Sequence, residues 1–478
     1  MRKYIIKIIF FGGILILALG QCHKVLKFKY EDGIYGMETM YRLEDNSIDV
    51  LALGSSHSFV DINPSVLYRE YGIAGFDLGG SRQPFWNSYY YLKEALKTQK
   101  PEVIILEAYA AVFSQQHGLE SEIIKSNYGL NFSKDKIESL KVSTPDGKLG
   151  YLLEWVYYHN RYEEIRKADF GKYLGKESKY KDWKGHYCLF VNTEFERPVI
   201  GEVREDIRMA EKEEEYYRKI IELAKEEGIP IMVIVSPYPV YTEEDAGLLF
   251  HAQKIAEEYG VPFINYNEKY DELALDFSVD FADIGHLSYL GSEKLTMDIG
   301  DYLSENYDLD DRREDPAYLS WERNAQYYEQ QVKNIEMRKI TDLSQYLEQI
   351  SKEREKYIAV ASAYGEGKER KEFAQWLYNG NGAAGGTEDG TWILGSGEPV
   401  FYQGEEGESY YHMELEDSDL AVKGITGGER VIVNHEILYF AQPGVSICVW
   451  DTIMGEVVDS VWFNPENGWE GERNEKWK

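Results

Sequence analysis

Short, nearly continuous apolar runs recur between residues 48 and 265, and each stops at a glycine or a polar residue. The runs are Ile48–Leu53, Val103–Leu106, Pro230–Val235 and Val261–Asn265. Runs of this length without a regular polar face are typical of strands that are buried on both sides. Between them, apolar residues recur at intervals of three and four, most clearly over residues 205–227 and 248–259, as on one face of a helix. Strands that alternate with helices predict an α/β fold, in which helices cover both faces of a parallel sheet.

The pattern changes along the chain and predicts its domain organisation. The α/β pattern occupies residues 30–305, with an irregular, aromatic-rich insertion at about residues 115–200. Residues 306–345 are strongly charged and predict a linker or a bridging helix. In residues 346–478 glycine is frequent, and strand-like runs occur at Arg430–Val433, Val445–Trp450 and Val457–Phe463. This last part predicts a smaller, mainly β accessory domain.

Residues 1–29 have the pattern of a targeting or anchoring segment. Arg2, Lys3 and Lys7 precede the apolar run Ile8–Leu19, and further lysines follow it. A bilayer span needs about 20 residues. The segment reaches that length only if Tyr4–Gly20 is counted, with the Lys7 side chain snorkelling towards the polar boundary.

Three fates of this segment remain open. We favour an uncleaved, single N-terminal membrane anchor. Cleavage after Gly20 would give a secreted protein, and Leu19–Cys22 resembles a bacterial lipobox, which would give a lipoprotein. All three place the chain from about residue 30 outside the cytoplasm, because the positively charged end of such a segment stays inside.

Charge and cysteine content exclude several classes of partner. The formal net charge is −32, from 52 Lys and Arg against 84 Asp and Glu, and such a chain repels phosphate backbones, so we expect no nucleic-acid partner. Cys22, Cys188 and Cys448 are far apart in the sequence and lack metal-ligand spacing. They predict neither a disulfide framework nor a metal site, and we expect no cofactor.

Candidate chemistry is concentrated in two short segments. The first, Gly54-Ser55-Ser56-His57, directly follows the first predicted strand, where a tight turn would present a serine hydroxyl at the carboxyl edge of the sheet. The second contains Asp283 and His286 and follows the last predicted strand. A carboxylate three residues before a histidine can hold Nδ1, which leaves Nε2 to deprotonate a serine. Each segment alone is common, since serine readily caps helices, but together they predict one site at a shared sheet edge.

Residues 48–303 resemble the SGNH/GDSL hydrolase superfamily. Gly54-Ser55-Ser56 matches the family's Gly-Asp-Ser block with Ser55 in place of Asp, and the run from Asp280 to Gly291 matches its late Asp-x-x-His block. The resemblance implies a flavodoxin-like parallel sheet, with Ser56 as nucleophile, His286 as general base and Asp283 as the residue that orients it.

The blocks that supply oxyanion donors in this family are altered. The resemblance implies backbone donors at Ser56 and within Asp77–Pro84, where Gly80 and Arg82 are the candidates. The third block should carry an asparagine after Val103–Leu106, but the chain reads Glu107-Ala108-Tyr109 there. Loss of one oxyanion donor lowers the rate by about 10² to 10³, so another donor substitutes, the enzyme is slow, or it is inactive.

Four further residues are candidates for contacts with substrate. His57 adjoins the nucleophile, while His159, Arg161 and Trp183 belong to polar, aromatic clusters in the insertion. Tryptophan suits the flat face of a sugar ring, and arginine binds carboxylates with two hydrogen bonds. The alternative interpretation is ordinary loop packing, because loops are generally rich in such residues.

The C-terminal part resembles the PANDER-like (interleukin-like EMT inducer) domain. The resemblance rests on Gly444–Asp451, Gly455–Val458 and Phe463, although Asn464 stands where that family has Asp. It implies a module that binds sugars or a partner and that supplies no catalytic group.

Together these features predict an extracytoplasmic serine O-acyl esterase or O-acyltransferase at a bacterial cell membrane. Its expected substrate is a carbohydrate acyl ester on a cell-surface or extracellular polysaccharide. This plan is similar to that of alginate and cell-wall acylation proteins, and the similarity implies a membrane acyl-transfer protein as partner. The alternative is a catalytically impaired protein that binds glycans or assists envelope assembly. A third hypothesis, an esterase for small acyl lipids, predicts an apolar groove beside Ser56.

Overall fold

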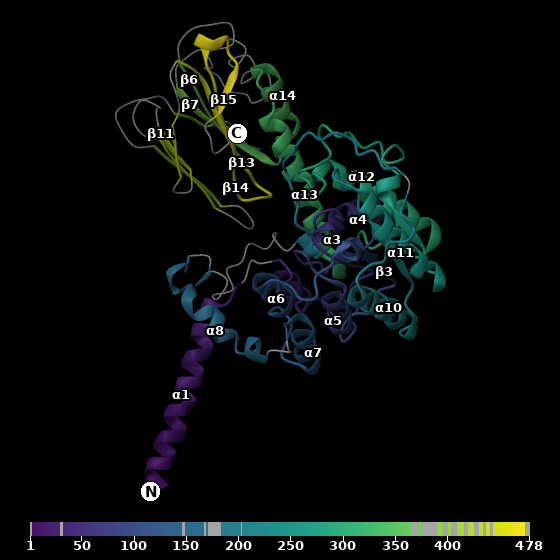
Figure 1. Cartoon of the computed structure of the whole chain (residues 1–478). Helices are drawn as coiled ribbons and strands as arrows, with labels where there is room; N and C mark the ends of the chain where they lie inside the picture. The colour runs from purple at the N-terminus through teal and green to yellow at the C-terminus, as the bar shows by residue number, and fades with distance from the viewer. Residues whose placement is uncertain are drawn as a thin grey trace. The chain divides into compact units, whose positions relative to one another are not determined.

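In the computed structural model of the chain, the four apolar runs form parallel strands of one sheet (Figure 1). They are β1 (Val50–Leu53), β3 (Val103–Glu107), β4 (Ile231–Val235) and β5 (Phe263–Asn265), and a fifth strand, β2 (Gly75–Asp77), lies at one edge. The order is β2-β1-β3-β4-β5, and every neighbouring pair is parallel. The predicted α/β class with a parallel sheet is confirmed. The strand β2 was not predicted, because three residues that begin with glycine give too short a pattern.

The structure describes the chain except for the following positions: residues 1, 29–31, 146–148, 167–168, 171–182, 202, 365–370, 372, 374–389, 395–399, 403–408, 415–418, 425–429, 434–435, 440–442 and 474–478. The chain divides into two units, Met1–Ala325 and Gln326–Lys478.

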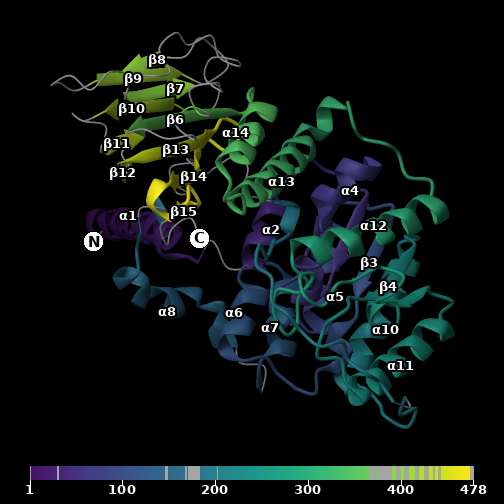
Figure 2. The same ribbon diagram turned by 90° about the horizontal axis from the view of Figure 1, so that it is seen from above.

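Helices cover both faces of the parallel sheet. They are α4 (Pro64–Tyr71), α5 (Phe85–Ala95), α10 (Glu211–Glu226), α11 (Glu243–Glu258) and α12 (Tyr289–Asn306). Leu51 and Ile104 share one core with apolar residues of α5, α10 and α11, whereas Val50 and Ile105 share another with residues of α4 and α12. Figure 2 shows the sheet between these two groups of helices. Successive strand residues therefore enter opposite cores, which explains why the runs have no polar face.

The irregular stretch at residues 115–200 lies between β3 and β4 in sequence. Its described residues form short helices: α6 (Glu120–Asn127), α7 (Lys134–Ser143), η3 (Leu149–Leu152), α8 (Glu154–Tyr158), η4 (His159–Glu163) and η5 (Trp183–Gly185). Other short elements of the first unit are α2 (Ile34–Met40), α3 (Ser56–Phe59), η1 (Tyr109–Val112), η6 (Tyr266–Glu268) and η7 (Pro316–Tyr318).

The N-terminal segment forms one long helix, α1 (Arg2–Leu26). Its stretch Tyr4–Leu26 has a mean hydropathy of 2.2, and this stretch is exposed. The helix is therefore long and apolar enough to be a membrane anchor or a signal sequence. The helix extends beyond the predicted run Ile8–Leu19, since the residues on either side of that run, polar ones among them, are also helical.

The charged segment after α12 packs against the first unit over part of its length. The Arg312 guanidinium lies 2.8 Å from the buried Asp49 carboxylate, and the Tyr68 hydroxyl donates to the Arg312 carbonyl. The helix α13 (Leu319–Arg338) then continues from the first unit into the second, and α14 (Leu343–Lys352) follows it.

The second unit contains two antiparallel sheets. One has the order β15-β14-β13-β6-β7-β8 and the other β12-β11-β10-β9. The strands are β6 (Tyr357–Tyr364), β7 (Gly390–Leu394), β8 (Val400–Tyr402), β9 (Ser409–Glu414), β10 (Asp419–Gly424), β11 (Arg430–Val433), β12 (Glu436–Tyr439), β13 (Gly444–Asp451), β14 (Glu456–Phe463) and β15 (Gly471–Arg473), with a short turn η8 (Pro465–Asn467). The predicted additional β structure is present as separate antiparallel sheets.

Candidate active site

Ser56 lies in a tight turn that follows β1 directly. Ser55 caps the short helix α3, and its hydroxyl accepts a hydrogen bond from the His57 N–H. Ser56 therefore occupies the first helical position, where a backbone N–H has no acceptor within the helix. The turn requires glycine at position 54, because a Cβ there would lie 2.8 Å from the Glu107 Cβ and 2.9 Å from the Ser58 Cβ.

Asp283 and His286 belong to a loop between β5 and α12. The loop is closed at its base by a bridge between Phe281 and Leu287. The Asp283 carboxylate lies 2.9 Å from Nδ1 of His286 and accepts hydrogen bonds from the N–H groups of Gly285 and His286. Partial burial acts to raise the pKa of Asp283, but the hydrogen bond from His286 and the backbone bonds outweigh it, so the pKa lies below its usual value. Asp283 is therefore a carboxylate that orients the imidazole through Nδ1.

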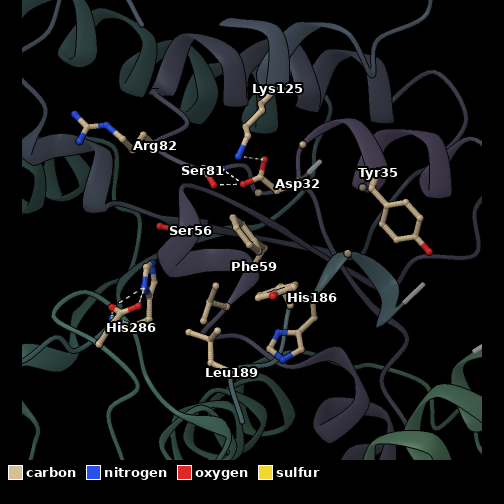
Figure 3. A pocket seen from close by; sticks show the side chains of 17 residues that line it. Asp32, Tyr35, Ser56, Phe59, Ser81, Arg82, Lys125, His186, Leu189 and His286 are labelled. Atoms are coloured by element: carbon tan, nitrogen blue, oxygen red, sulfur yellow. Dashed lines mark hydrogen bonds and ion pairs between the residues drawn. The ribbon is translucent and has the colours of Figure 1, made fainter. Parts of the chain in front are cut away.

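Ser56, Asp283 and His286 line the same cavity, which has a volume of about 520 Å³. Figure 3 shows the Ser56 hydroxyl and the His286 ring on the same side of it. The Nε2 atom of His286 is buried and has no hydrogen-bond partner among the described residues. In this arrangement Nε2 is the ring nitrogen that is available to exchange a proton with a group in the cavity.

The cavity has two chemically different walls beyond these three residues. Phe59, Val60 and Leu189 provide an apolar wall. A polar wall contains Asp32, whose carboxylate lies 3.5 Å from the Lys125 ammonium and accepts hydrogen bonds from the N–H and hydroxyl groups of Ser81. Figure 3 shows the Asp32, Ser81 and Lys125 side chains together on this wall.

His186, between these walls, is a buried residue whose pKa burial lowers to about 3, so its ring is neutral. No sequence motif marks Asp32 or Lys125 as a cavity residue, whereas His186 belongs to the same polar, aromatic cluster as Trp183.

Asp61 connects the serine segment to the histidine loop. It is fully buried, its Oδ1 accepts a hydrogen bond of 2.9 Å from the Leu287 N–H, and its carbonyl accepts one from the Ser292 hydroxyl. Burial raises the pKa of Asp61 well above its usual value. The sequence analysis missed this residue, although a carboxylate five positions after the candidate nucleophile was visible.

The His57 side chain is buried next to His286 and is not among the residues that line the cavity. Its ring stacks on Tyr109 with 3.7 Å between centroids, and its centroid is 5.3 Å from that of His286. The side chain is buried, and burial followed by the nearby His286 lowers the pKa of His57 well below its usual value. His57 thus packs as a neutral ring next to His286, and its predicted contact with substrate stays a prediction.

Two further buried carboxyl groups support the serine turn at the ends of neighbouring strands. Asp77 ends β2 and accepts hydrogen bonds from the Ser58 hydroxyl and the Gly79 N–H. Glu107 ends β3 and accepts hydrogen bonds from the Ser55 hydroxyl and the Tyr109 N–H. Burial raises the pKa of each to about 8. Their position at the carboxyl ends of strands is the feature by which the sequence could have indicated that they lie near the site.

The three candidate oxyanion donors differ in their surroundings. Ser56 and Arg82 line the cavity, whereas the Gly80 N–H donates to the Gly54 carbonyl at 3.3 Å. That N–H is already used, because a backbone group has one donor hydrogen. The Arg82 side chain forms an ion pair of 2.8 Å with Glu122. Of the three, the Ser56 N–H is the donor whose position at the start of a helix leaves it available.

The remaining candidates for substrate contact are in the insertion, and two of them, Arg161 and Trp183, are not among the described residues that line this cavity. The Arg161 guanidinium donates to the carbonyls of Leu26 and Lys27 and to Asp169. Trp183 packs near Phe190 and precedes the cavity residues Gly185 and His186. The side chain of His159 lies outside the described residues. Arg161 thus holds the end of α1, since its donors are directed there.

Within the described part of the chain, no group of three or more His, Cys, Asp or Glu side chains is arranged to hold a metal ion. The cysteines are free thiols: Cys22 is exposed, Cys188 partly buried and Cys448 buried. Ser56, His286 and Asp283 contribute a hydroxyl, an imidazole and a carboxylate to the cavity.

Comparison with known proteins adds little to this geometry. No family model matches the chain, and no curated protein matches it. One solved structure that is similar is a putative acylhydrolase from Bacteroides fragilis NCTC 9343, with 12% sequence identity and a TM-score of 0.27. The match covers 56% of this chain and 93% of that chain. At this level of similarity the interpretation of the site rests on its own residues.

Proposed function

We propose that the protein is an SGNH-type serine O-acyl esterase or O-acyltransferase. The observation that carries the proposal is that Ser56, His286 and Asp283 line one cavity, with Asp283 held on Nδ1 of His286 and Nε2 without a partner. A hydroxyl next to an oriented imidazole is the arrangement that nucleophilic acyl transfer requires.

The reaction proceeds in two halves. In the first, the Ser56 hydroxyl attacks the ester carbonyl while Nε2 of His286 takes its proton. The same proton passes to the departing alcohol, and an acyl-serine remains. In the second half, water or a sugar hydroxyl gives its proton to Nε2 and attacks the acyl carbon, and Ser56 recovers a proton as it leaves. Asp283 stabilises the imidazolium that forms in each half.

The oxyanion of each tetrahedral intermediate needs donors from this chain. The Ser56 N–H is one, because it begins a helix and has no acceptor there. The Arg82 backbone, at a φ of 50° on the cavity lining, is the second proposed donor. These donors stand in for the family asparagine that the Glu107-Ala108-Tyr109 segment lacks.

The walls of the cavity support a polar acyl ester as the substrate class. Phe59 and Leu189 would contact the acyl group, and the polar wall around Asp32 and Lys125 would bind hydroxyl groups of a sugar. The apolar helix α1, preceded by basic residues, supports action on an extracytoplasmic polysaccharide at a bacterial membrane. A small-acyl-lipid substrate is less favoured, because one wall is ionic.

Active-site labelling tests the nucleophile and the base. We expect the full-length protein to react with a fluorophosphonate at Ser56 and to hydrolyse p-nitrophenyl acetate. Ser56→Ala and His286→Ala should both lose turnover, whereas Ser278→Ala and His251→Ala, which change residues outside the cavity lining, should retain it. Normal turnover in Ser56→Ala or in His286→Ala would contradict the assignment.

A second measurement separates hydrolysis from transfer and identifies the preferred ester. Acetate release is compared with transfer of the acetyl group to an added polysaccharide, and p-nitrophenyl esters of increasing chain length are compared in parallel. A polysaccharide-dependent fall in free acetate indicates transfer. A preference for long acyl chains would favour the lipid esterase instead.

One observation favours a second candidate, a catalytically impaired glycan-binding or assembly protein. The Gly80 N–H is already donated to Gly54, and the family asparagine is absent, so oxyanion stabilisation is reduced. This candidate predicts no covalent adduct at Ser56, together with binding of acylated polysaccharide that survives Ser56→Ala.

A further inference from the structure

Exposed apolar side chains gather next to the C-terminal end of α1. They belong to α8, to η4 and to the residue before α8: Leu153, Trp155, Val156 and Tyr162. Val156 is 54% exposed and Tyr162 is 63% exposed. Soluble proteins rarely leave neighbouring large apolar side chains uncovered, and such patches mark sites of interaction.

This segment is fastened to α1. The His23 ring lies 3.5 Å from the Glu154 carboxylate, and its centroid is 6.2 Å from that of Trp155. The Arg161 guanidinium donates to the Leu26 carbonyl at 2.7 Å. Figure 1 shows α8 beside the end of α1 that leads into the rest of the unit. The exposed residues are therefore held at a definite position along α1.

Two charged side chains of the segment, Glu154 and Arg161, are paired with protein groups, in contrast to its exposed apolar side chains. Glu154 accepts from Lys136 at 2.5 Å as well as facing His23, and Arg161 pairs with Asp169. Trp155 and Val156, the next two residues of the same helix, are exposed. A helical segment with charged side chains paired to the protein and apolar side chains exposed has the pattern of a segment that lies against an apolar medium.

The length of α1 sets the depth at which this patch would lie. Twenty residues at 1.5 Å each cross a hydrocarbon core of about 30 Å. Counted from Tyr4, the twentieth residue is His23. Trp155, which lies beside His23, would thus be at the boundary between hydrocarbon and headgroups, where tryptophan and tyrosine are enriched.

We propose that the patch formed by Leu153, Trp155, Val156 and Tyr162 inserts into the lipid headgroup boundary beside α1. The protein then has two membrane contacts, a span and an interfacial helix. Glu163 and Glu164, which are exposed next to Tyr162, provide no attraction for anionic lipids, so apolar burial supplies the binding energy.

The proposal does not depend on the catalytic function, but it has a consequence for the cavity. Asp32 and Gly33, which line the cavity, follow Leu26 by six and seven residues. Six residues span about 20 Å at most, so this wall of the cavity would lie within that distance of Leu26, the last residue of α1. A substrate on or near the membrane surface would be within reach.

Fluorescence of the full-length protein in vesicles tests the insertion. With Cys22, Cys188 and Cys448 replaced by serine or alanine, a single cysteine at Val156→Cys is labelled with the environment-sensitive dye NBD. The matched control is Val199→Cys, at a residue that is 93% exposed. In phosphatidylcholine vesicles, the dye at position 156 should emit at shorter wavelength and be quenched at least twofold more by doxyl-labelled lipid than the dye at position 199.

Two other outcomes would overturn the proposal. Equal quenching at both positions means that the patch lies in water. A blue shift without quenching by doxyl lipid means that a second copy or another protein covers it. A double variant, Trp155→Glu with Tyr162→Glu, supplies an independent readout without a label at the patch. When the full-length protein is in vesicles, this double variant should show less protection of residues 150–165 from hydrogen exchange than the parent protein, while α1 remains in the membrane.

Discussion

The two segments that supply the candidate catalytic residues are built differently. From Gly54 to Asp61 every residue except Ser56 is buried, and the segment continues directly from β1. In the loop that carries His286, the Asp283 side chain is 51% exposed and Ile284 is exposed. The position of the hydroxyl is therefore set by the core of the sheet, whereas that of the imidazole is set by hydrogen bonds within its own loop and by the link from Asp61 to Leu287.

This difference means that stability and activity should respond differently in the two segments. Changes around Ser56 disturb close packing and unfold the protein, since buried groups cannot move without loss of contacts. Changes around His286 alter the orientation of its imidazole ring. They cost little packing, because a changed side chain in this exposed loop can extend into solvent.

The largest effect is expected from Asp283→Asn. Loss of the carboxylate removes the charge that stabilises the imidazolium and favours the wrong tautomer of His286, so turnover of p-nitrophenyl acetate should fall by roughly 10⁴-fold, as for the equivalent change in a Ser-His-Asp triad. The melting temperature should stay close to that of the parent protein, because Asp283 is half exposed. A large drop in melting temperature would show that the loop is as tightly integrated as the serine turn.

A matched pair of glycine substitutions compares the packing of the two segments. In Gly54→Ala the new Cβ would lie 2.8 Å from the Glu107 Cβ, whereas in Gly285→Ala the nearest atom, Nε2 of His57, is 3.6 Å away. Urea denaturation should show that Gly54→Ala lowers the free energy of unfolding by about 1–3 kcal/mol. Gly285→Ala should change it by less than about 0.5 kcal/mol. Equal effects would remove the contrast.

The buried carboxyl groups predict how stability depends on pH. The pKa of Glu107 is about 8 in the folded protein, against its usual value of 4.5. The folded protein therefore holds a proton that the unfolded chain releases between these values. This contribution is fully present below about pH 4.5 and is lost as the pH rises to about 8. Each unit of pKa corresponds to about 1.4 kcal/mol.

Between pH 5 and 8 the free energy of unfolding of the parent protein should fall. In Glu107→Gln this fall should be smaller by about 1.4 kcal/mol or more. Thermal unfolding at a series of pH values measures this, and Asp77, with a pKa also of about 8, gives a second variant, Asp77→Asn. Asp283→Asn is the control from the exposed loop: the pKa of Asp283 is lowered from 3.8, so this group titrates below the measured range and the variant should leave the fall between pH 5 and 8 unchanged. An unchanged pH profile in Glu107→Gln would mean that Glu107 is ionised when folded.

The smallest effect is expected at Ile284, an exposed apolar residue two positions before His286. Ile284→Ser should change the free energy of unfolding by less than about 0.5 kcal/mol, as measured by urea denaturation. A matched substitution on the other segment, Val60→Ser, changes a buried residue and should cost clearly more. If Ile284→Ser costs as much as Val60→Ser, the loop is packed and not simply solvated.

Much of the first unit was predictable because the responsible interactions are local or repetitive. The strands β1, β3, β4 and β5 follow from apolar runs, since a strand buried on both faces has no polar position to interrupt it. The contact of Asp283 with His286 follows from a spacing of three residues. By contrast, three residues hold no pattern that predicts β2, and nothing in the sequence indicates the hydrogen bond from Arg161 to the end of α1.

The sequence alone determined the class of fold, the apolar N-terminal helix and the identity of the groups that can react. The parallel order of the strands brought Ser56 and His286, which are 230 positions apart, to one cavity. The folded chain shows in addition that the Gly80 N–H is already used, that His57 is a buried neutral ring, and that Asp32 and Lys125 form a cavity wall. These properties depend on which distant groups fill the space around each side chain, and a local pattern of residues carries no record of that.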